Sequence, residues 1–100
     1  MTADFAFEEI QDDGVHVVTL HGELDLANAE RVRTALIEVA GSTVVVDLGD
    51  LSFLDSSGIA ALLGARKRIL AAGHGFELRG AQGMVRRVLE LTGLAHLLTD

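Results

Sequence analysis

The sequence predicts a small α/β domain in which a mixed β-sheet is covered by α-helices. Short apolar segments typical of strands alternate along the chain with segments whose apolar residues recur at helical spacing. Turns and helix ends are marked by glycine alone, because the chain has 11 glycines and no proline. A length of 100 residues is enough for a single core, which predicts one domain over residues 1–100.

The chain is expected to open with a β-hairpin. Phe5, Phe7 and Ile10 alternate with other residues as in a strand that has one buried face. Residues 11–14 (QDDG) are expected to form the turn, and a second strand is expected to begin at residue 15 and run to residue 20. These two strands are predicted to lie beside each other.

Residues 22–25 (GELD) close the second strand and lead into the first helix. An apolar stripe at helical spacing predicts this helix, and Asp25 or Asn28 is expected to cap it. The stripe consists of Ala29, Val32, Leu36, Val39 and Ala40. Residues 41–42 end the helix, and a buried strand follows over residues 44–48. The order of strand, helix and strand predicts a parallel crossover.

The second half of the chain is expected to add two helices and one strand. A helix is predicted over residues 57–72, with Ile59 and Leu63 on a face that packs on the sheet and Gly73 at its C-terminal end. Leu62 and Leu70 belong to the same apolar stripe. A strand over residues 75–79 precedes a last helix, whose apolar positions are Met84, Val85, Val88 and Leu89. The final apolar stretch, residues 94–98, is expected to close the core.

Charge and composition exclude several classes of function. The formal net charge of -7 and the isoelectric point near 4.9 argue against nucleic-acid binding, which requires an excess of clustered basic residues. The three consecutive basic residues 66–68 point in different directions on a helix and do not form one patch, so we interpret them as solvent-exposed side chains. No segment approaches the ~20 apolar residues of a membrane span, and no signal peptide is visible, so a cytoplasmic protein without membrane insertion is expected.

No metal or cofactor site is expected. The chain has no cysteine, which removes disulfides, thiolate ligands and a cysteine nucleophile. His16 and His21 occupy polar positions of the second strand, and we interpret them as exposed side chains because no partner ligands are placed by spacing. The glycines of residues 80–83 (GAQG) are too few and ill-spaced for a dinucleotide-binding motif, so an enzyme is not expected.

The most informative segment is residues 47–58 (DLGDLSFLDSSG), a hydroxyl-rich turn between a strand and a helix. The first amide groups of a helix lack partners and lie at the positive end of its dipole, so a hydroxyl or phosphate placed there meets donors. Ser56 and Ser57 therefore have three interpretations. One of them caps the helix; Ser56 is a nucleophile; or a serine accepts a phosphate beside Asp55. The nucleophile is disfavoured because His74 and His96 belong to no strand-to-helix elbow.

These motifs closely resemble those of the anti-sigma factor antagonists, the stand-alone members of the bacterial STAS domain family. Residues 51–58 (LSFLDSSG) match the phosphorylation loop of that family, and residues 22–25 (GELD) match the motif after its second strand. Residues 85–89 (VRRVL) and 92–94 (TGL) add weaker support. The resemblance spans nearly the whole chain.

The resemblance implies a partner-switching cycle. The serine that follows the aspartate, here Ser56, is expected to be phosphorylated by an anti-sigma factor that acts as an ATP-dependent kinase. The unphosphorylated chain is expected to bind that anti-sigma factor and release a sigma factor, and a serine phosphatase is expected to reset the cycle. We assign Asp25, Asp55, Ser56, Ser57 and Gly58 to the partner-binding surface, while capping remains an alternative for the two aspartates. A non-phosphorylated accessory STAS subunit of a transport or signalling complex is the alternative function.

Overall fold

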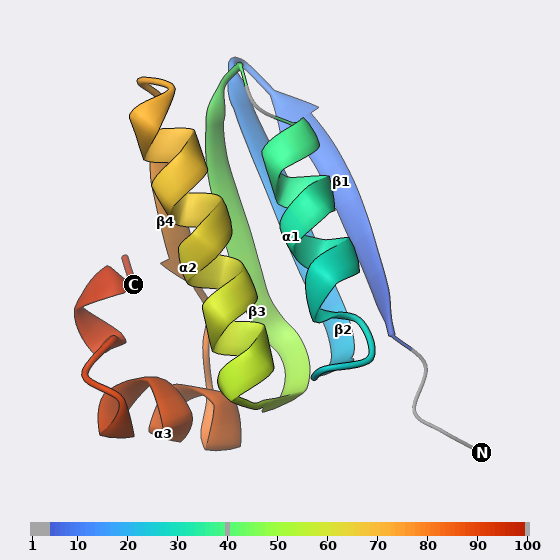
Figure 1. The fold of residues 1–100 in the computed structure, drawn as a ribbon, viewed down its shortest axis with the longest axis vertical. Coiled ribbons are helices and arrows are strands. Elements are labelled where there is room, and N and C mark those ends of the chain that lie inside the picture. Colours follow the sequence, from blue (N-terminus) through green and yellow to red (C-terminus); the bar gives the residue numbers. More distant parts are fainter. Residues whose placement is uncertain (1–4, 40, 100) are drawn as a thin grey trace.

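The computed structural model describes residues 5–39 and 41–99, which form one four-stranded sheet with helices packed on it (Figure 1). The elements are β1 (Ala6–Asp12), β2 (Val15–Leu24), α1 (Ala29–Glu38), β3 (Thr43–Leu54), α2 (Ser56–Ala71), β4 (Phe76–Arg79), α3 (Gly83–Leu91) and the 3-10 turn η1 (Ala95–Leu97). The strands follow the order β1-β2-β3-β4. Pairing is antiparallel between β1 and β2 and parallel for the other two pairs, which confirms the predicted mixed sheet.

The opening hairpin forms as predicted, with a tighter turn. Asp12 pairs with Val15, so Asp13 and Gly14 alone connect the strands. Their φ angles are 54° and 82°, and two consecutive positive φ angles are what the hairpin turn of type I′ requires. The twist of this turn matches that of the flanking strands and fixes their register.

One face of the sheet carries the core. Helices α1 and α2 lie side by side over this face in Figure 1, and alternate residues of β2 and β3 point toward them. The fully buried strand residues on this face include Leu20, Val44, Val46 and Leu48. The predicted stripe of α1 is confirmed at Ala29, Val32 and Leu36, which are buried, whereas Ala40 lies outside the described residues.

The strands β2 and β3 are longer than the sequence pattern indicated. The strand expected at residues 44–48 continues to Leu54, because β3 keeps pairing with β2 across two shifts in register. Register shifts of this kind accommodate extra residues and increase the local twist. The expected turn over residues 47–58 is therefore wrong, since Asp55 alone separates β3 from α2.

The buried face of α2 matches the predicted stripe only in part, because Leu62 is buried and Ile59 packs against the core but the other two residues are exposed. Leu63 is 36% exposed and Leu70 is 42% exposed. The buried positions of α2 are Gly58, Ala61, Leu62, Ala65 and Ile69. Small residues let the helix lie close to the sheet, so the face with the smallest side chains is buried. Leu63 instead lines a narrow gap beside Leu94 and Leu97, which cover this flank of α2 incompletely.

The end of the chain closes the core as expected. Leu94, Leu97 and Leu98 pack against the buried cluster, and the Thr99 N–H donates to the Leu78 carbonyl at 2.9 Å. The predicted C-terminal glycine of α2 is also confirmed, because Gly73 has a φ of 88° and its N–H donates to the Leu70 carbonyl. In the described part of the chain, none of the helices has the length and hydropathy needed to cross a membrane.

Candidate functional site

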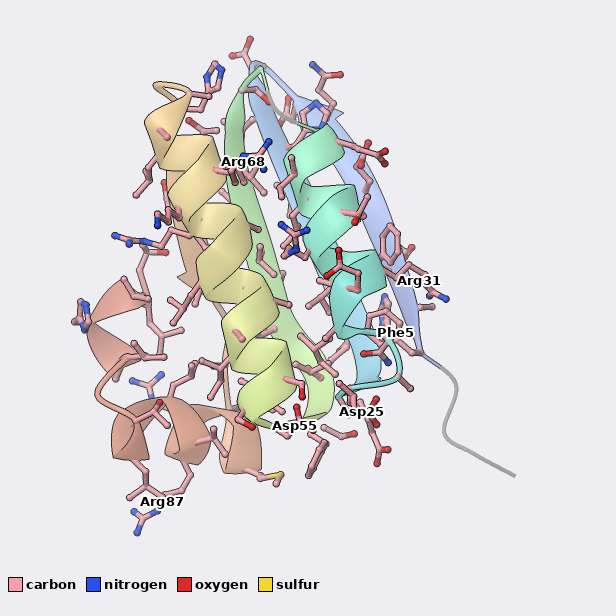
Figure 2. All side chains as sticks on the ribbon, viewed as in Figure 1. Phe5, Asp25, Arg31, Asp55, Arg68 and Arg87 are labelled. Carbon is pink, nitrogen blue, oxygen red and sulfur yellow. The ribbon has the colours of Figure 1, made fainter. Side chains whose placement is uncertain are left out.

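The paired ends of β2 and β3 bring two aspartates to the same end of the sheet. Leu24 pairs with Leu54, and the N–H of Asp55 donates to the Leu24 carbonyl at 3.3 Å. Asp25 and Asp55 each follow one of these paired residues, and Figure 2 shows them close together beside the start of α2. Asp25 and Asp55 therefore lie at the same end of the sheet.

Asp55, not a serine, caps α2. Its backbone is extended, and its Oδ1 accepts a hydrogen bond from the Gly58 N–H at 3.0 Å. The expectation that Ser56 or Ser57 caps the helix is wrong because the chain leaves β3 at Asp55, which makes the serines the first two helical residues. An aspartate at this position satisfies one helix donor and places negative charge at the positive end of the dipole.

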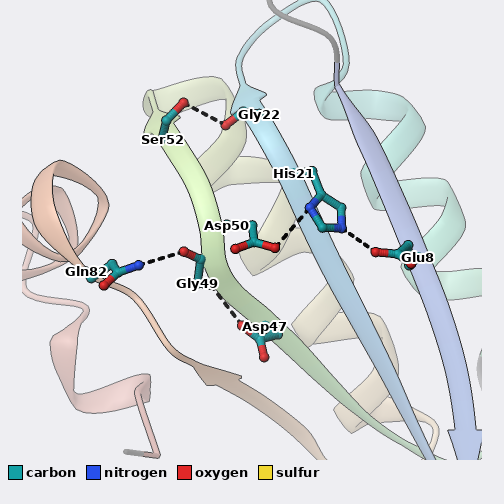
Figure 3. Close-up of polar contacts among 8 residues, drawn as sticks. All are labelled: Glu8, His21, Gly22, Asp47, Gly49, Asp50, Ser52 and Gln82. Carbon is teal, nitrogen blue, oxygen red and sulfur yellow. Dashed lines mark hydrogen bonds and ion pairs between the residues drawn. The ribbon is translucent and has the colours of Figure 1, made fainter.

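This arrangement leaves the Ser56 hydroxyl available. Ser56 is exposed and Ser57 is half-buried, and within residues 5–39 and 41–99 neither hydroxyl has a hydrogen-bond partner. The Ser52 hydroxyl, by contrast, donates to the Gly22 carbonyl at 3.1 Å (Figure 3). The first amide groups of α2 have no acceptor within the helix. The geometry therefore presents an accessible hydroxyl next to unpaired backbone donors.

Gly58 has a packing role. A Cβ atom at this position would lie 2.7 Å from Leu54 Cδ1, 2.8 Å from Leu24 Cγ and 2.9 Å from the Leu24 carbonyl oxygen. The first turn of α2 thus rests directly on the backbone where β2 ends. Gly58 itself is buried. Its absent side chain allows the start of α2 to approach the strands.

We therefore expect Gly58→Ala to lower the free energy of unfolding by about 1–3 kcal/mol, because overpacking forces the helix away from the sheet. Gly64→Ala in the same helix is the matched control. Its Cβ would lie 3.3 Å from Cδ of the flexible Arg33 side chain, and alanine gains up to about 1 kcal/mol of helix propensity. Urea unfolding monitored by circular dichroism measures both variants. Equal stability of the two would show that the start of α2 can shift without cost.

The loop between β2 and α1 is held by its own side chains. Asp25 Oδ1 accepts from the Ala27 N–H at 3.0 Å, and Asn28 Oδ1 accepts from the Asp25 N–H at 3.0 Å. Asn28 also donates from Nδ2 to the Glu23 carbonyl at 2.8 Å. Asn28 is the N-cap residue of α1, as one of the two predicted alternatives had it, but its side chain makes no capping bond. Both side chains bond within the loop instead.

Sequence reasoning missed an exposed residue at the tip of this loop. Leu26 is 78% exposed and directly follows Asp25. It lines a cavity of about 310 Å³ between α1 and α2. The other lining residues are Ala29, Glu30, Arg33, Ser57, Ala60 and Ala61. The available signal was that this leucine lies between Asp25 and Asn28 and belongs to no apolar stripe.

The two segments that carry the aspartates contain no basic residue. Residues 22–30 and 51–65 contain neither lysine nor arginine. Arg68 lies at the other end of α2 in Figure 2. Arg33 is paired with Glu30, with Nη2 and Oε2 2.9 Å apart, and this hydrogen-bonded ion pair lowers the pKa of the Glu30 carboxyl. The surface around Ser56 is therefore free of cations from its own two segments.

The two histidines of β2 are more enclosed than we predicted. His16 is half-buried, with Nδ1 3.7 Å from Glu9 Oε1. His21 lies between two carboxylates on the sheet face opposite α1 and α2, with Nε2 near Glu8 and Nδ1 3.1 Å from Asp50 Oδ2 (Figure 3). Because the two carboxylates contact opposite nitrogens of the ring, they cannot both join His21 in binding one metal ion. No set of three metal-ligating side chains gathers anywhere in residues 5–39 and 41–99.

Comparison with known proteins identifies the family. The STAS domain model matches residues 6–99. The chain belongs to the STAS domain family. An anti-sigma F factor antagonist of Paenibacillus polymyxa is 33% identical over 89 residues, which cover 85% of this chain and 76% of that protein. The family resemblance stated from the motifs is thereby confirmed.

Solved structures agree with this assignment. The anti-sigma factor antagonist SpoIIAA in its unphosphorylated form superposes with a TM-score of 0.82 and 29% identity, over 95% of this chain and 87% of that one. The phosphorylated form of the Bacillus cell fate determinant SpoIIAA gives a TM-score of 0.72 and 30% identity, over 95% and 90% of the two chains. The fold is thus that of anti-sigma factor antagonists, as the sequence predicted.

Proposed function

We propose that this STAS domain, residues 1–100, is an anti-sigma factor antagonist that is switched by phosphorylation of Ser56. The unphosphorylated chain binds an anti-sigma factor kinase and so releases a sigma factor. The phosphorylated chain does not bind, and a serine phosphatase restores the hydroxyl. The chain acts in the cytoplasm as a binding protein, not as an enzyme.

The exposed Ser56 hydroxyl at the start of α2 is the observation that carries this proposal. A kinase needs an accessible hydroxyl, and Ser56 is exposed while Ser52 is engaged with the Gly22 carbonyl. Asp55 and Gly58 hold the backbone on either side of the first turn, so the hydroxyl is presented from a fixed position. Relatives described as anti-sigma factor antagonists, one of them known in a phosphorylated form, supply the class of partner.

Charge explains how one phosphate can abolish binding. A phosphoserine carries a charge of roughly -1.5 to -2 at pH 7. Residues 22–30 and 51–65 offer it no lysine or arginine, and Asp55 lies directly beside it. A partner that covers this surface must remove water from the phosphate. Because these two segments supply no cation to pair with the phosphate, this desolvation costs several kcal/mol. A tenfold loss of affinity needs about 1.4 kcal/mol, so the effect is large enough for a switch.

The assignment of the acceptor predicts a single modified residue. After incubation with ATP and the cognate anti-sigma factor, mass spectrometry should locate the phosphate on Ser56. Ser57→Ala, which keeps the acceptor, should be phosphorylated like the wild type. Dominant modification at Ser57 or Ser52 would contradict the assignment.

Ser56→Ala should bind the anti-sigma factor with or without ATP, whereas Ser56→Asp should bind more weakly than the wild type. The alanine variant should also keep its melting temperature, because Asp55 makes the capping bond of α2 and the Ser56 hydroxyl makes none in the described structure. Calorimetric titration of each variant with the anti-sigma factor measures the affinities. Binding of the wild type that ATP leaves unchanged would favour the accessory STAS subunit.

A further inference from the structure

We infer that the cavity between α1 and α2, which Leu26 helps to line, takes an apolar side chain of the anti-sigma factor and anchors it beside Ser56. This inference rests on the proposed function and concerns the part of the same interface that lies next to Ser56. The cavity measures about 310 Å³, and Ser57 contributes to its wall. It therefore adjoins the residue next to the phosphoacceptor.

The size of a stable interface requires contacts beyond Ser56. Specific complexes bury about 800 Å² of each partner, which is roughly a seventh of the 5458 Å² surface of this chain. Such an area cannot be supplied by one turn of helix. The cavity and the loop with Leu26 border the start of α2 directly, so a protein that covers Ser56 also covers them.

The chemistry of the cavity selects an apolar occupant. Its lining includes the buried Ala29 and Ala61 and the exposed Ala60. The charged residues at its rim, Glu30 and Arg33, satisfy each other through two hydrogen bonds of 2.9 and 3.2 Å. No unpaired charge in this wall calls for an ion from the partner. An apolar side chain packs against these alanines without leaving an unpaired charge in the wall.

Leu26 has the features of a binding anchor. It is 78% exposed, yet its loop is ordered by the hydrogen bonds of Asp25 and Asn28 described above. An apolar side chain on a loop that is already rigid loses little conformational entropy on binding. Burying a leucine contributes about 1.5–3 kcal/mol, which corresponds to tenfold or more in affinity. The anchor thus supplies affinity, while Ser56 supplies the switch.

Two variants test the anchor from both sides of the cavity. Leu26→Ala removes the exposed leucine, and Ala60→Glu places a charge on an exposed wall residue. Each should lower the affinity for the purified cognate anti-sigma factor at least tenfold in calorimetric titration. Both should keep the melting temperature of the wild type, because the changed side chains are exposed. Leu91→Ala is the matched control, since Leu91 is 71% exposed on α3 and does not line the cavity.

The outcomes separate this inference from the proposed function. If the wild type binds but both variants bind within twofold of it, the cavity is not part of the interface and the inference is overturned. A wild type that neither binds nor is phosphorylated overturns the proposed function, and the inference with it. Sedimentation velocity of the chain alone tests whether a second copy of the chain occupies the cavity instead. Self-association that Leu26→Ala abolishes would assign the cavity to a second copy and overturn the inference.

Discussion

Leu62→Ala should lower the free energy of unfolding by about 2–5 kcal/mol, whereas Leu63→Ala should lower it by less than about 1 kcal/mol. Leu62 is 2% exposed and belongs to the buried cluster between α2 and the sheet. Its truncation leaves a cavity that rigid neighbours fill incompletely. Leu63 is 36% exposed, so its side chain loses less contact and gives up less buried area.

Urea unfolding of the two variants measures this difference. The two substitutions remove the same atoms from adjacent residues of one helix, so helix propensity cancels between them. A loss of 2 kcal/mol or more would be a large fraction of the ~5–15 kcal/mol that stabilises a domain. Similar losses in both variants would mean that α2 is rotated about its axis relative to the described packing.

This pair also shows why the sequence pattern was right for only part of the buried face. Apolar spacing identified α2 and its approximate length, because that information is local. Which of its sides is buried depends on how closely the helix approaches the sheet. The small residues Ala61 and Ala65 allow the closest approach, while the larger Leu63 and Leu70 are left at the flanks. Hydrophobicity alone ranks these positions in the opposite order.

The strand ends were beyond sequence reasoning for a related reason. Gly49 and Asp50 interrupt the apolar run that begins at Val44, so the pattern predicted a strand end where β3 in fact continues to Leu54. The extension is produced by pairing with β2, a contact between segments about 30 residues apart. Alternation within one segment does not reveal a partner strand of this kind.

The candidate site was predictable to the level of its residues but not of their roles. Three adjacent residues, Asp55, Ser56 and Ser57, are all good capping types, and the backbone path alone decides which of them caps α2. The motif resemblance singled out Ser56, and the exposed position of its side chain agrees with that choice. The cavity beside Leu26 required the relative placement of α1 and α2, which no local pattern contains.

Phosphorylation of Ser56 should lower the affinity for the anti-sigma factor about a hundredfold or more, equivalent to roughly 2.7 kcal/mol, without refolding the domain. The unpaired amide groups at the start of α2 can donate hydrogen bonds to the phosphate without moving. Asp55 holds the first turn through the Gly58 N–H, and the absent Cβ of Gly58 lets that turn pack on Leu24. The structure leaves this turn little freedom to rearrange, so the loss of affinity comes from charge at the interface.

Amide chemical shifts of the free chain, measured before and after phosphorylation, distinguish this local mechanism from an allosteric one. Changes should concentrate in residues 53–60 and around Asp25, because the Asp55 N–H bonds to the carbonyl that precedes Asp25. Helix α3 should change little, since its side-chain link to β3 runs from Gln82 to the Gly49 carbonyl, on the strand before the switch. Large shifts throughout residues 84–91, or an affinity that falls less than tenfold, would contradict a local electrostatic switch.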